Sequence, residues 1–100
     1  LADVALVGSS DYPVHSFDPL VGIRAAVSRR NARGVVVDPE ERITLDEAIT
    51  MYTRRAAEVL GVGAETGTLT AGKRADVVVV EGLEDAAPRV VQTFVGAAPV

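Results

Sequence analysis

The residues best suited to chemistry lie near the start of the chain, in the segment Gly8-Ser9-Ser10-Asp11-Tyr12-Pro13. This segment follows the apolar run Val4-Ala5-Leu6-Val7, and we expect a short strand buried on both faces over residues 3–7. In α/β enzymes the strand ends open into a crevice, and Gly and Ser let the backbone approach a ligand closely. A carboxylate placed there can transfer protons or contact a metal ion. Asp11 is therefore the candidate catalytic residue, although Ser-Asp-Tyr-Pro is also ordinary turn chemistry.

His15 is the one histidine of the chain, and there is no cysteine. Asp11 and His15 are spaced i, i+4, but Pro13 between them argues against a shared helical face. Two ligands would also leave a zinc site incomplete. We therefore expect His15 to be a loop or pocket-wall residue rather than a metal ligand.

The segment Gly67-Thr68-Leu69-Thr70-Ala71-Gly72-Lys73 has the glycine and lysine spacing of a phosphate-binding loop. Such a loop needs Ser or Thr after the lysine and a helix beyond it. Here Arg74 follows, and the chain continues into Val77-Val78-Val79-Val80. We therefore expect a β-turn at residues 70–73, with Asp76 bonding turn amides before a strand.

The elements that must position Asp11 begin with a helix directly after its loop. Asp18 is a good N-cap, and Pro19 suits the first helical position. The helix is expected to close at Arg29-Arg30, since cations suit its negative end. Residues 31–42 are expected to be a loop, in which Val35-Val36-Val37 forms a short strand or a buried crossing.

The clearest helix of the sequence is the next one, expected over about residues 45–60. Thr44-Leu45-Asp46-Glu47 is a capping box, with Thr at the N-cap and Glu at the third helical position. An apolar stripe then recurs at helical spacing, formed by Leu45, Ala48, Ile49, Tyr52, Ala56, Val59 and Leu60. Gly61 or Gly63 is expected to end the helix.

The second half of the chain changes to the pattern of strands. Four consecutive valines at 77–80 predict a strand covered on both faces or nearly so, and residues 90–95 predict a second strand that Gly96 ends. Strands with this much apolar surface cannot cover themselves in a chain of 100 residues. We expect them to be part of a sheet whose other strands lie elsewhere.

Composition limits the function classes. The chain is 48% hydrophobic with 4% aromatic residues, so any core is built from small aliphatic side chains, and stability on its own is in doubt. The net charge of −4 argues against nucleic acid and anionic membranes as partners. No run approaches the ~18 apolar residues of a membrane span. A cytoplasmic location follows by default.

Three ordered motifs carry a family resemblance. They are Ser10-Asp11-Tyr12-Pro13 with Asp18-Pro19-Leu20, then residues 39–48, then residues 67–79. In this order they resemble the C-terminal end of enzymes of the amidohydrolase superfamily, in particular the amidohydrolase 3 branch, which includes N-substituted formamide deformylases. The resemblance implies an α/β fold. Residues 1–62 would supply the last strand and outer helices of a (β/α)8 metal-dependent hydrolase barrel, and residues 63–100 would supply β-strands of a small composite β-sandwich.

The same resemblance implies roles for the residues of the first loop. Asp11 corresponds to the aspartate that contacts the catalytic metal and moves the proton. The metal would be divalent, with Zn²⁺ the first choice, as one or two ions whose remaining ligands lie on earlier strands outside this chain. Tyr12, His15 and Phe17 follow Asp11 in the loop and would form substrate-pocket wall.

Two functions follow from this reasoning. The first is the C-terminal portion of an amidohydrolase that cleaves a non-peptide C–N bond of a small amide or formamide by metal-activated water, its partners being the small-molecule substrate and the rest of the hydrolase chain. The alternative is a non-catalytic, free-standing fragment that oligomerises through exposed β-strands. In either case we expect the 100-residue chain to be inactive alone.

Overall fold

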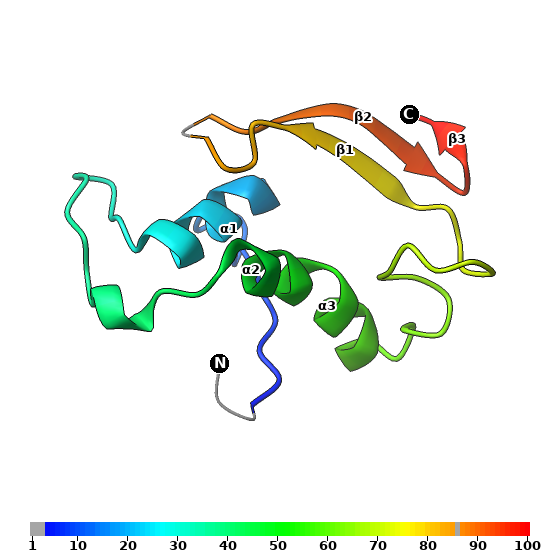
Figure 1. Cartoon of the computed structure of the whole chain (residues 1–100), viewed down its shortest axis with the longest axis horizontal. Helices are drawn as coiled ribbons and strands as arrows, with labels where there is room; N and C mark the ends of the chain where they lie inside the picture. Colours follow the sequence, from blue (N-terminus) through cyan, green and yellow to red (C-terminus); the bar gives the residue numbers. More distant parts are fainter. Residues whose placement is uncertain (1–3, 86) are drawn as a thin grey trace.

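The computed structural model describes residues 4–85 and 87–100. The helices form one layer, and a small sheet lies across it, close to the helices at one end and away from them at the other (Figure 1). Among the described residues, no helix has the length and apolar character that crossing a membrane requires. In chain order the elements are α1 (Pro19–Ser28), η1 (Pro39–Glu41), α2 (Leu45–Tyr52), α3 (Arg54–Val59), β1 (Val77–Glu81), β2 (Arg89–Val95) and β3 (Ala98–Pro99).

Helix α1 begins and ends as the sequence predicts. The carboxylate of Asp18 accepts a hydrogen bond from the Leu20 amide (3.0 Å), and Pro19 occupies the first helical position. At the other end Arg29 adopts a left-handed conformation (φ 54°), and its amide donates to the Ala25 carbonyl oxygen. These caps satisfy backbone groups that a helix end leaves free, so the helix is defined by local sequence.

The loop after α1 contains more structure than the sequence indicated. Val36 forms an isolated antiparallel bridge with Arg30. Of the two alternatives for residues 35–37, this agrees with the short strand, reduced to a single bridged pair. The short 3-10 helix η1 was not predicted. It begins at Pro39, which suits the start of a helix, and the Arg42 amide closes it by donating to the Pro39 carbonyl oxygen.

The predicted second helix has the expected start. The Glu47 amide donates to the Thr44 hydroxyl oxygen (3.2 Å), and the Glu47 carboxylate accepts from the Thr44 amide (2.7 Å). This is the reciprocal capping box that the sequence predicted.

The prediction of one continuous helix over residues 45–60 was wrong, because the helix breaks at Thr53 and forms α2 and α3. The Thr53 hydroxyl donates to the Ile49 carbonyl oxygen (2.8 Å), and the Thr53 backbone leaves the helical region (φ −125°, ψ −95°). A Thr hydroxyl that bonds four residues back bends a helix, which accounts for the position of the break.

Gly61 ends α3, and it is one of the two glycines predicted to end this helix. Its φ of +76° is left-handed, and its amide donates to the Glu58 carbonyl oxygen (3.0 Å). The Val62 amide then donates to the Ala57 carbonyl oxygen (2.9 Å). This pair of hydrogen bonds is a Schellman motif, in which Gly supplies the left-handed residue.

The strand predicted at residues 3–7 is wrong for the part that the structure describes; residue 3 lies outside the described residues. Residues 4–7 have no regular secondary structure, and all four are exposed. A strand needs a neighbour to pair its backbone N–H and C=O groups. The described sheet consists of β1, β2 and β3 and does not include this segment.

The sheet is antiparallel, in the order β1-β2-β3. Val77 pairs with Phe94 and Glu81 with Arg89, with a register shift between Val79 and Val80. The unpredicted strand β3 follows a two-residue turn at Gly96-Ala97, where φ is positive at both residues (56° and 68°), as a type I′ hairpin turn requires. The prediction that Gly96 ends the second strand is confirmed.

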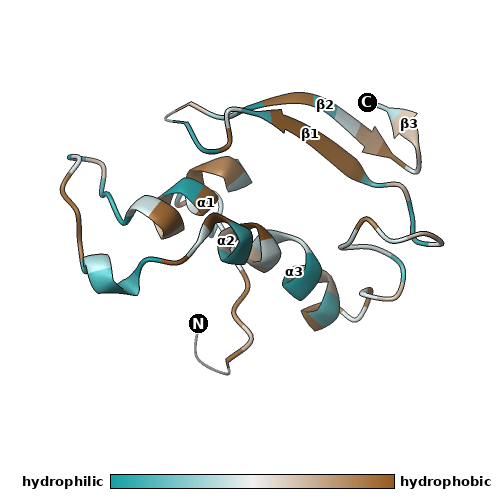
Figure 2. Ribbon diagram, viewed as in Figure 1, coloured by the Kyte–Doolittle hydropathy of each residue, from teal (hydrophilic) through white to brown (hydrophobic). Residues whose placement is uncertain are grey.

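The expectation that the four valines are covered on both faces is wrong for this chain. Val78 is 53% exposed and Val79 is 44% exposed. Figure 2 shows the apolar character of β1 along its length, and of β2 on both sides of a more polar middle stretch. The helices cover β1 only at one end, where Val80 and Leu83 pack on the cluster of Leu20, Ile23 and Ala48. The rest of the sheet therefore presents apolar surface without a covering layer.

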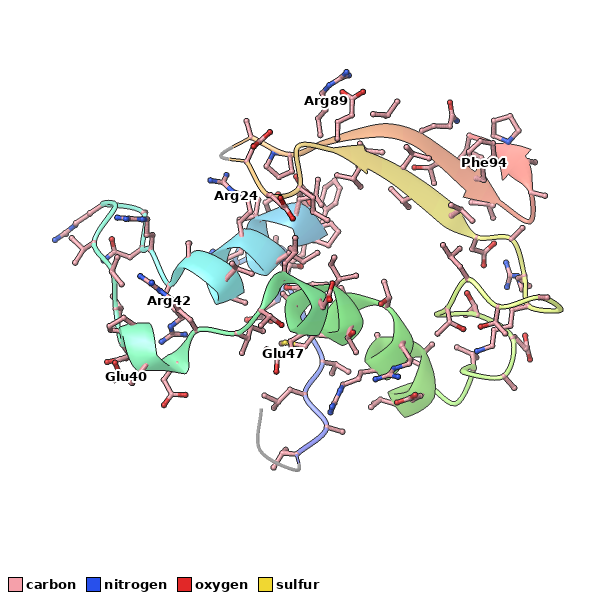
Figure 3. The ribbon with its side chains drawn as sticks, viewed as in Figure 1. Arg24, Glu40, Arg42, Glu47, Arg89 and Phe94 are labelled. Carbon is pink, nitrogen blue, oxygen red and sulfur yellow. The ribbon has the colours of Figure 1, made fainter. Side chains whose placement is uncertain are left out.

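Polar contacts at both ends of β1 fix the hairpin. The Arg89 guanidinium donates to the Glu81 carboxylate (2.6 Å) across the strand pair, on the side of the sheet away from the helices (Figure 3). At the other end the Asp76 carboxylate accepts from the Gly96 amide (2.9 Å) and pairs with Arg74 (3.3 Å). The predicted structural role of Asp76 is correct in kind, but the amide belongs to the turn after β2. The turn predicted at residues 70–73 is present.

Candidate functional site

The candidate site is the loop between the irregular segment at residues 4–7 and helix α1. Asp11 is exposed there and has a left-handed backbone (φ 52°). Its carbonyl oxygen accepts from the Val14 amide (2.9 Å), which closes a turn. The Ser9 hydroxyl accepts from the Asp11 amide (3.4 Å) and the Ser10 hydroxyl from the Tyr12 amide (3.2 Å). The turn interpretation of Ser-Asp-Tyr-Pro is therefore confirmed, and the turn presents the carboxylate at the surface.

Two of the predicted pocket-wall residues lie together. The rings of Tyr12 and Phe17 are 5.4 Å apart with an interplanar angle of 76°, an edge-to-face pair. Both side chains are largely exposed, at 65% and 74%. His15 is exposed in the same loop and is not part of this pair. The loop thus carries an open aromatic surface near Asp11.

Two hydrogen bonds hold the segment before Asp11 against the helices. The Gly8 amide donates to the Met51 carbonyl oxygen at the end of α2 (3.2 Å), and the Arg55 guanidinium of α3 donates to the Val4 carbonyl oxygen (3.3 Å). The break at Thr53 lies between these two attachment points. The position of the Asp11 loop therefore depends on where α2 ends and how α3 is turned from it.

The Tyr52 ring fills the space between this segment and α1. A Cβ atom on Gly8 would overlap the ring, and a Cβ on Gly22 of α1 would overlap its hydroxyl oxygen. Neither glycine has a positive φ, so backbone conformation does not require them. Glycine is required at both positions because the Tyr52 ring occupies the space that a side chain would need.

The described donors do not make a metal centre. Over residues 4–85 and 87–100, no group of three or more His, Cys, Asp or Glu side chains could hold an ion. A protein zinc site takes at least three such ligands. Asp11 offers one carboxylate on an exposed turn, and the described residues do not by themselves complete a zinc site.

One cavity is a separate feature, which we call the helix–strand cleft. It has a volume of about 800 Å³ and lies between α2–α3 and the start of β1. Asp11 is not among its lining residues. The cleft is bounded mainly by apolar and threonine side chains, which include Ile49, Tyr52, Thr53, Ala57, Leu60, Val62, Leu69, Val77 and Val78. Its lining provides apolar packing surface.

Among the residues that the structure describes, one carboxyl group has a clearly altered pKa. The Thr44 amide, followed by the Thr44 hydroxyl, hydrogen-bonds the Glu47 carboxylate and lowers its pKa below the ordinary value. Glu47 lies at the start of α2 (Figure 3). The altered pKa belongs to a helix cap.

Comparison with known proteins gives the loop its context. The sequence profile of the amidohydrolase family, amidohydrolase 3 branch, matches residues 2–97. The chain belongs to this family. It is 38% identical to the N-substituted formamide deformylase of Arthrobacter pascens over 80% of this chain and 15% of that protein. It is 32% identical to YtcJ, named as an amidohydrolase, of Bacillus subtilis (strain 168), over 79% of this chain and 16% of that protein.

A shorter match covers 35% of the chain, which is 60% identical there to an imidazolonepropionase of Agrobacterium fabrum, over 8% of that protein. No solved structure is significantly similar to the chain. The chain spans only 15–16% of the length of the first two relatives. These matches establish the family of the chain.

The sequence reasoning missed the residues that anchor the Asp11 loop. Gly8 was interpreted as freedom for ligand approach and Tyr52 as part of an apolar stripe, yet the Tyr52 ring lies against both Gly8 and Gly22. A sequence signal existed, since Gly22 stands inside the predicted helix. A helix interior disfavours glycine by about 0.5–1 kcal/mol relative to alanine unless space or packing requires it.

Proposed function

We propose that this chain is the C-terminal portion of a metal-dependent amidohydrolase that cleaves the C–N bond of a small amide or formamide. Its family membership and its similarity to a formamide deformylase support a hydrolase. In this proposal residues 1–62 belong to the barrel and residues 63–100 to the small sandwich. The observation that carries the catalytic assignment is the exposed turn that presents the Asp11 carboxylate within the family match.

The uncovered surface of the chain supports its place in a larger protein. Val78 and Val79 of β1 are largely exposed, and the helix–strand cleft leaves the start of β1 open. Burial of apolar surface contributes roughly 25 cal/mol per Å², so further chain packed on these strands would stabilise them. We propose that the rest of the hydrolase supplies that layer.

The steps proposed for this chain are proton transfers at the Asp11 carboxylate. The carboxylate accepts a proton from the attacking water molecule as the water oxygen bonds to the carbonyl carbon of the substrate. It then gives the proton to the nitrogen as the C–N bond breaks, which releases an amine and a carboxylic acid. A divalent metal, when bound by ligands outside this chain together with Asp11, would polarise the carbonyl and acidify the water. Tyr12 and Phe17 would bound the substrate on one side.

The test begins with the native gene product. We expect intact-mass analysis of the product from its source cell to give a mass several times the 10.4 kDa of this chain. The purified product should release amine from a panel of N-alkylformamides and N-alkylacetamides. A native product of about 10.4 kDa, or a larger one that hydrolyses no member of the panel, would contradict the proposal.

The same exposed strand supports a second candidate. β1 is an edge strand, and unpaired edges associate with other strands. A non-catalytic product of this length would then oligomerise through β1. Light scattering of the purified chain distinguishes this candidate: it requires a dimer or a larger assembly, and a stable monomer would contradict it.

A further inference from the structure

Tyr52 occupies a point where three segments meet. It is the last residue of α2, directly before the break at Thr53. Its ring lies where a side chain of Gly8 would be, and its hydroxyl group lies where a side chain of Gly22 would be. The ring therefore sets the spacing between α2, α1 and the segment that leads to the Asp11 turn.

A second contact holds Gly8 in the other direction. Its amide donates to the carbonyl oxygen of Met51, the residue before Tyr52 (3.2 Å). Carbonyl groups in the last turn of a helix need partners from outside that helix. The ring and this hydrogen bond together fix Gly8 relative to the end of α2.

The path from Gly8 to Asp11 is short and internally bonded. The hydroxyl groups of Ser9 and Ser10 accept the amides of Asp11 and Tyr12. Asp11 then holds a left-handed conformation and closes the turn to Val14. A displacement of Gly8 is consequently carried into the turn that presents the carboxylate.

We propose that Tyr52 is the positioning residue for Asp11, acting through Gly8. This inference rests on the proposed function, since it assigns a partner to the carboxylate that moves the proton. A change in the Tyr52 ring should alter the turnover step rather than substrate binding, because Tyr52 reaches Asp11 only through the backbone of residues 8–11. A misplacement of about 1 Å can lower a rate by roughly a hundredfold.

The experiment uses the complete hydrolase and the panel substrate that it cleaves fastest. Tyr52→Ala removes the ring, Tyr52→Leu keeps apolar volume without it, and Tyr52→Phe keeps the ring. Gly8→Ala disturbs the contact between Gly8 and the Tyr52 ring from the Gly8 side, because the new methyl group would overlap the ring. Gly63→Ala is the matched control, because Gly63 has no positive φ and its new Cβ would meet the flexible Glu58 side chain at 3.3 Å.

We expect Tyr52→Ala, Tyr52→Leu and Gly8→Ala to lower kcat by about 10- to 100-fold while KM changes by less than about threefold. Tyr52→Phe and Gly63→Ala should stay within about threefold of the wild-type kcat. Circular dichroism identifies any variant that fails to fold. If Tyr52→Ala does fail, Tyr52→Leu and Gly8→Ala still decide the question.

Two different failures are distinguishable. If Asp11→Asn abolishes turnover while folded Tyr52→Leu and Gly8→Ala keep the wild-type kcat, the positioning role is overturned and the proposed function stands. If Asp11→Asn keeps the wild-type kcat, the proposed function fails, and the role of Tyr52 falls with it. A loss in Tyr52→Phe equal to that in Tyr52→Ala would also overturn the inference, because the ring would not restore the position.

Discussion

Replacing Gly22 by alanine should destabilise this chain, although the same change stabilises most helices. Gly22 lies inside α1 (Pro19–Ser28). The helix itself gains about 0.5–1 kcal/mol from the change, because alanine loses less backbone freedom than glycine. The new Cβ, however, would overlap the hydroxyl oxygen of Tyr52 and lie 2.9 Å from its Cζ atom.

The overlap is expected to outweigh the helix gain. Forcing an extra methyl group into filled space costs about 1–3 kcal/mol. The Tyr52 ring cannot simply swing away, since its Cδ2–Cε2 edge also lies against Gly8. Subtraction of the helix gain leaves Gly22→Ala destabilising by about 1 kcal/mol, within limits of about 0 and 2.5 kcal/mol.

The assay is urea unfolding followed by circular dichroism, on the wild type, Gly22→Ala, Tyr52→Phe and the double variant. Removing the hydroxyl should relieve part of the penalty, with a coupling of at least about 0.5 kcal/mol, because the two changes act on one contact. Some penalty should remain, since the Cζ atom is still close. The reasoning would be refuted if Gly22→Ala were more stable than the wild type by the full helix gain, or if the two changes were additive.

Three further outcomes follow from local contacts. Because the pKa of Glu47 is lowered in the folded chain, the ionised Glu47 carboxylate contributes its full stabilisation above the ordinary Glu pKa, and this stabilisation is lost as pH falls through the lowered pKa. Acidification should therefore lower the Tm of the wild type more than the Tm of Glu47→Gln. Equal slopes of Tm against pH for the two proteins would contradict this. Gly67→Ala should lower the urea midpoint clearly, because φ is +97° and the new Cβ would lie 2.6 Å from the Ala57 Cβ; an unchanged midpoint would count against it. Asp76→Ala removes the acceptor of the Gly96 amide, so hydrogen exchange of that amide should rise about 5- to 10-fold, and unchanged exchange would show that the contact is dispensable.

Local signals in the sequence predicted the elements whose ends are fixed by their own residues. The Asp18 cap, the Thr44–Glu47 capping box and the Gly61 terminus all lie where their chemistry indicated. Each of these involves hydrogen bonds between residues a few positions apart. Their energies do not depend on the rest of the fold, so sequence alone was sufficient.

Elements that depend on distant partners were less predictable. The apolar run at residues 4–7 forms no strand, because a strand requires a paired neighbour. Val78 and Val79 of β1 remain exposed for a related reason. An apolar pattern predicts burial of a strand, but burial also requires another element to pack on it. The break at Thr53 depends on one side-chain hydrogen bond within an otherwise helical pattern.

The candidate site shows the same division. Asp11 and the aromatic residues of its loop are candidates from residue types and from family resemblance; the structure confirms the turn and adds the Tyr12–Phe17 pair. The contact of Tyr52 with Gly8 joins residues 44 positions apart along the chain. No local pattern encodes such a contact.

The most direct test of the account is the kcat of Asp11→Asn in the complete hydrolase, with Asp46→Asn as control. Asp46 is an exposed carboxylate in the first turn of α2, outside the Asp11 loop. If Asp11 moves the proton, Asp11→Asn should lower kcat by about 10²- to 10⁴-fold while the protein stays folded, and Asp46→Asn should retain activity. A folded Asp11→Asn variant with the kcat of the wild type would contradict the central claim.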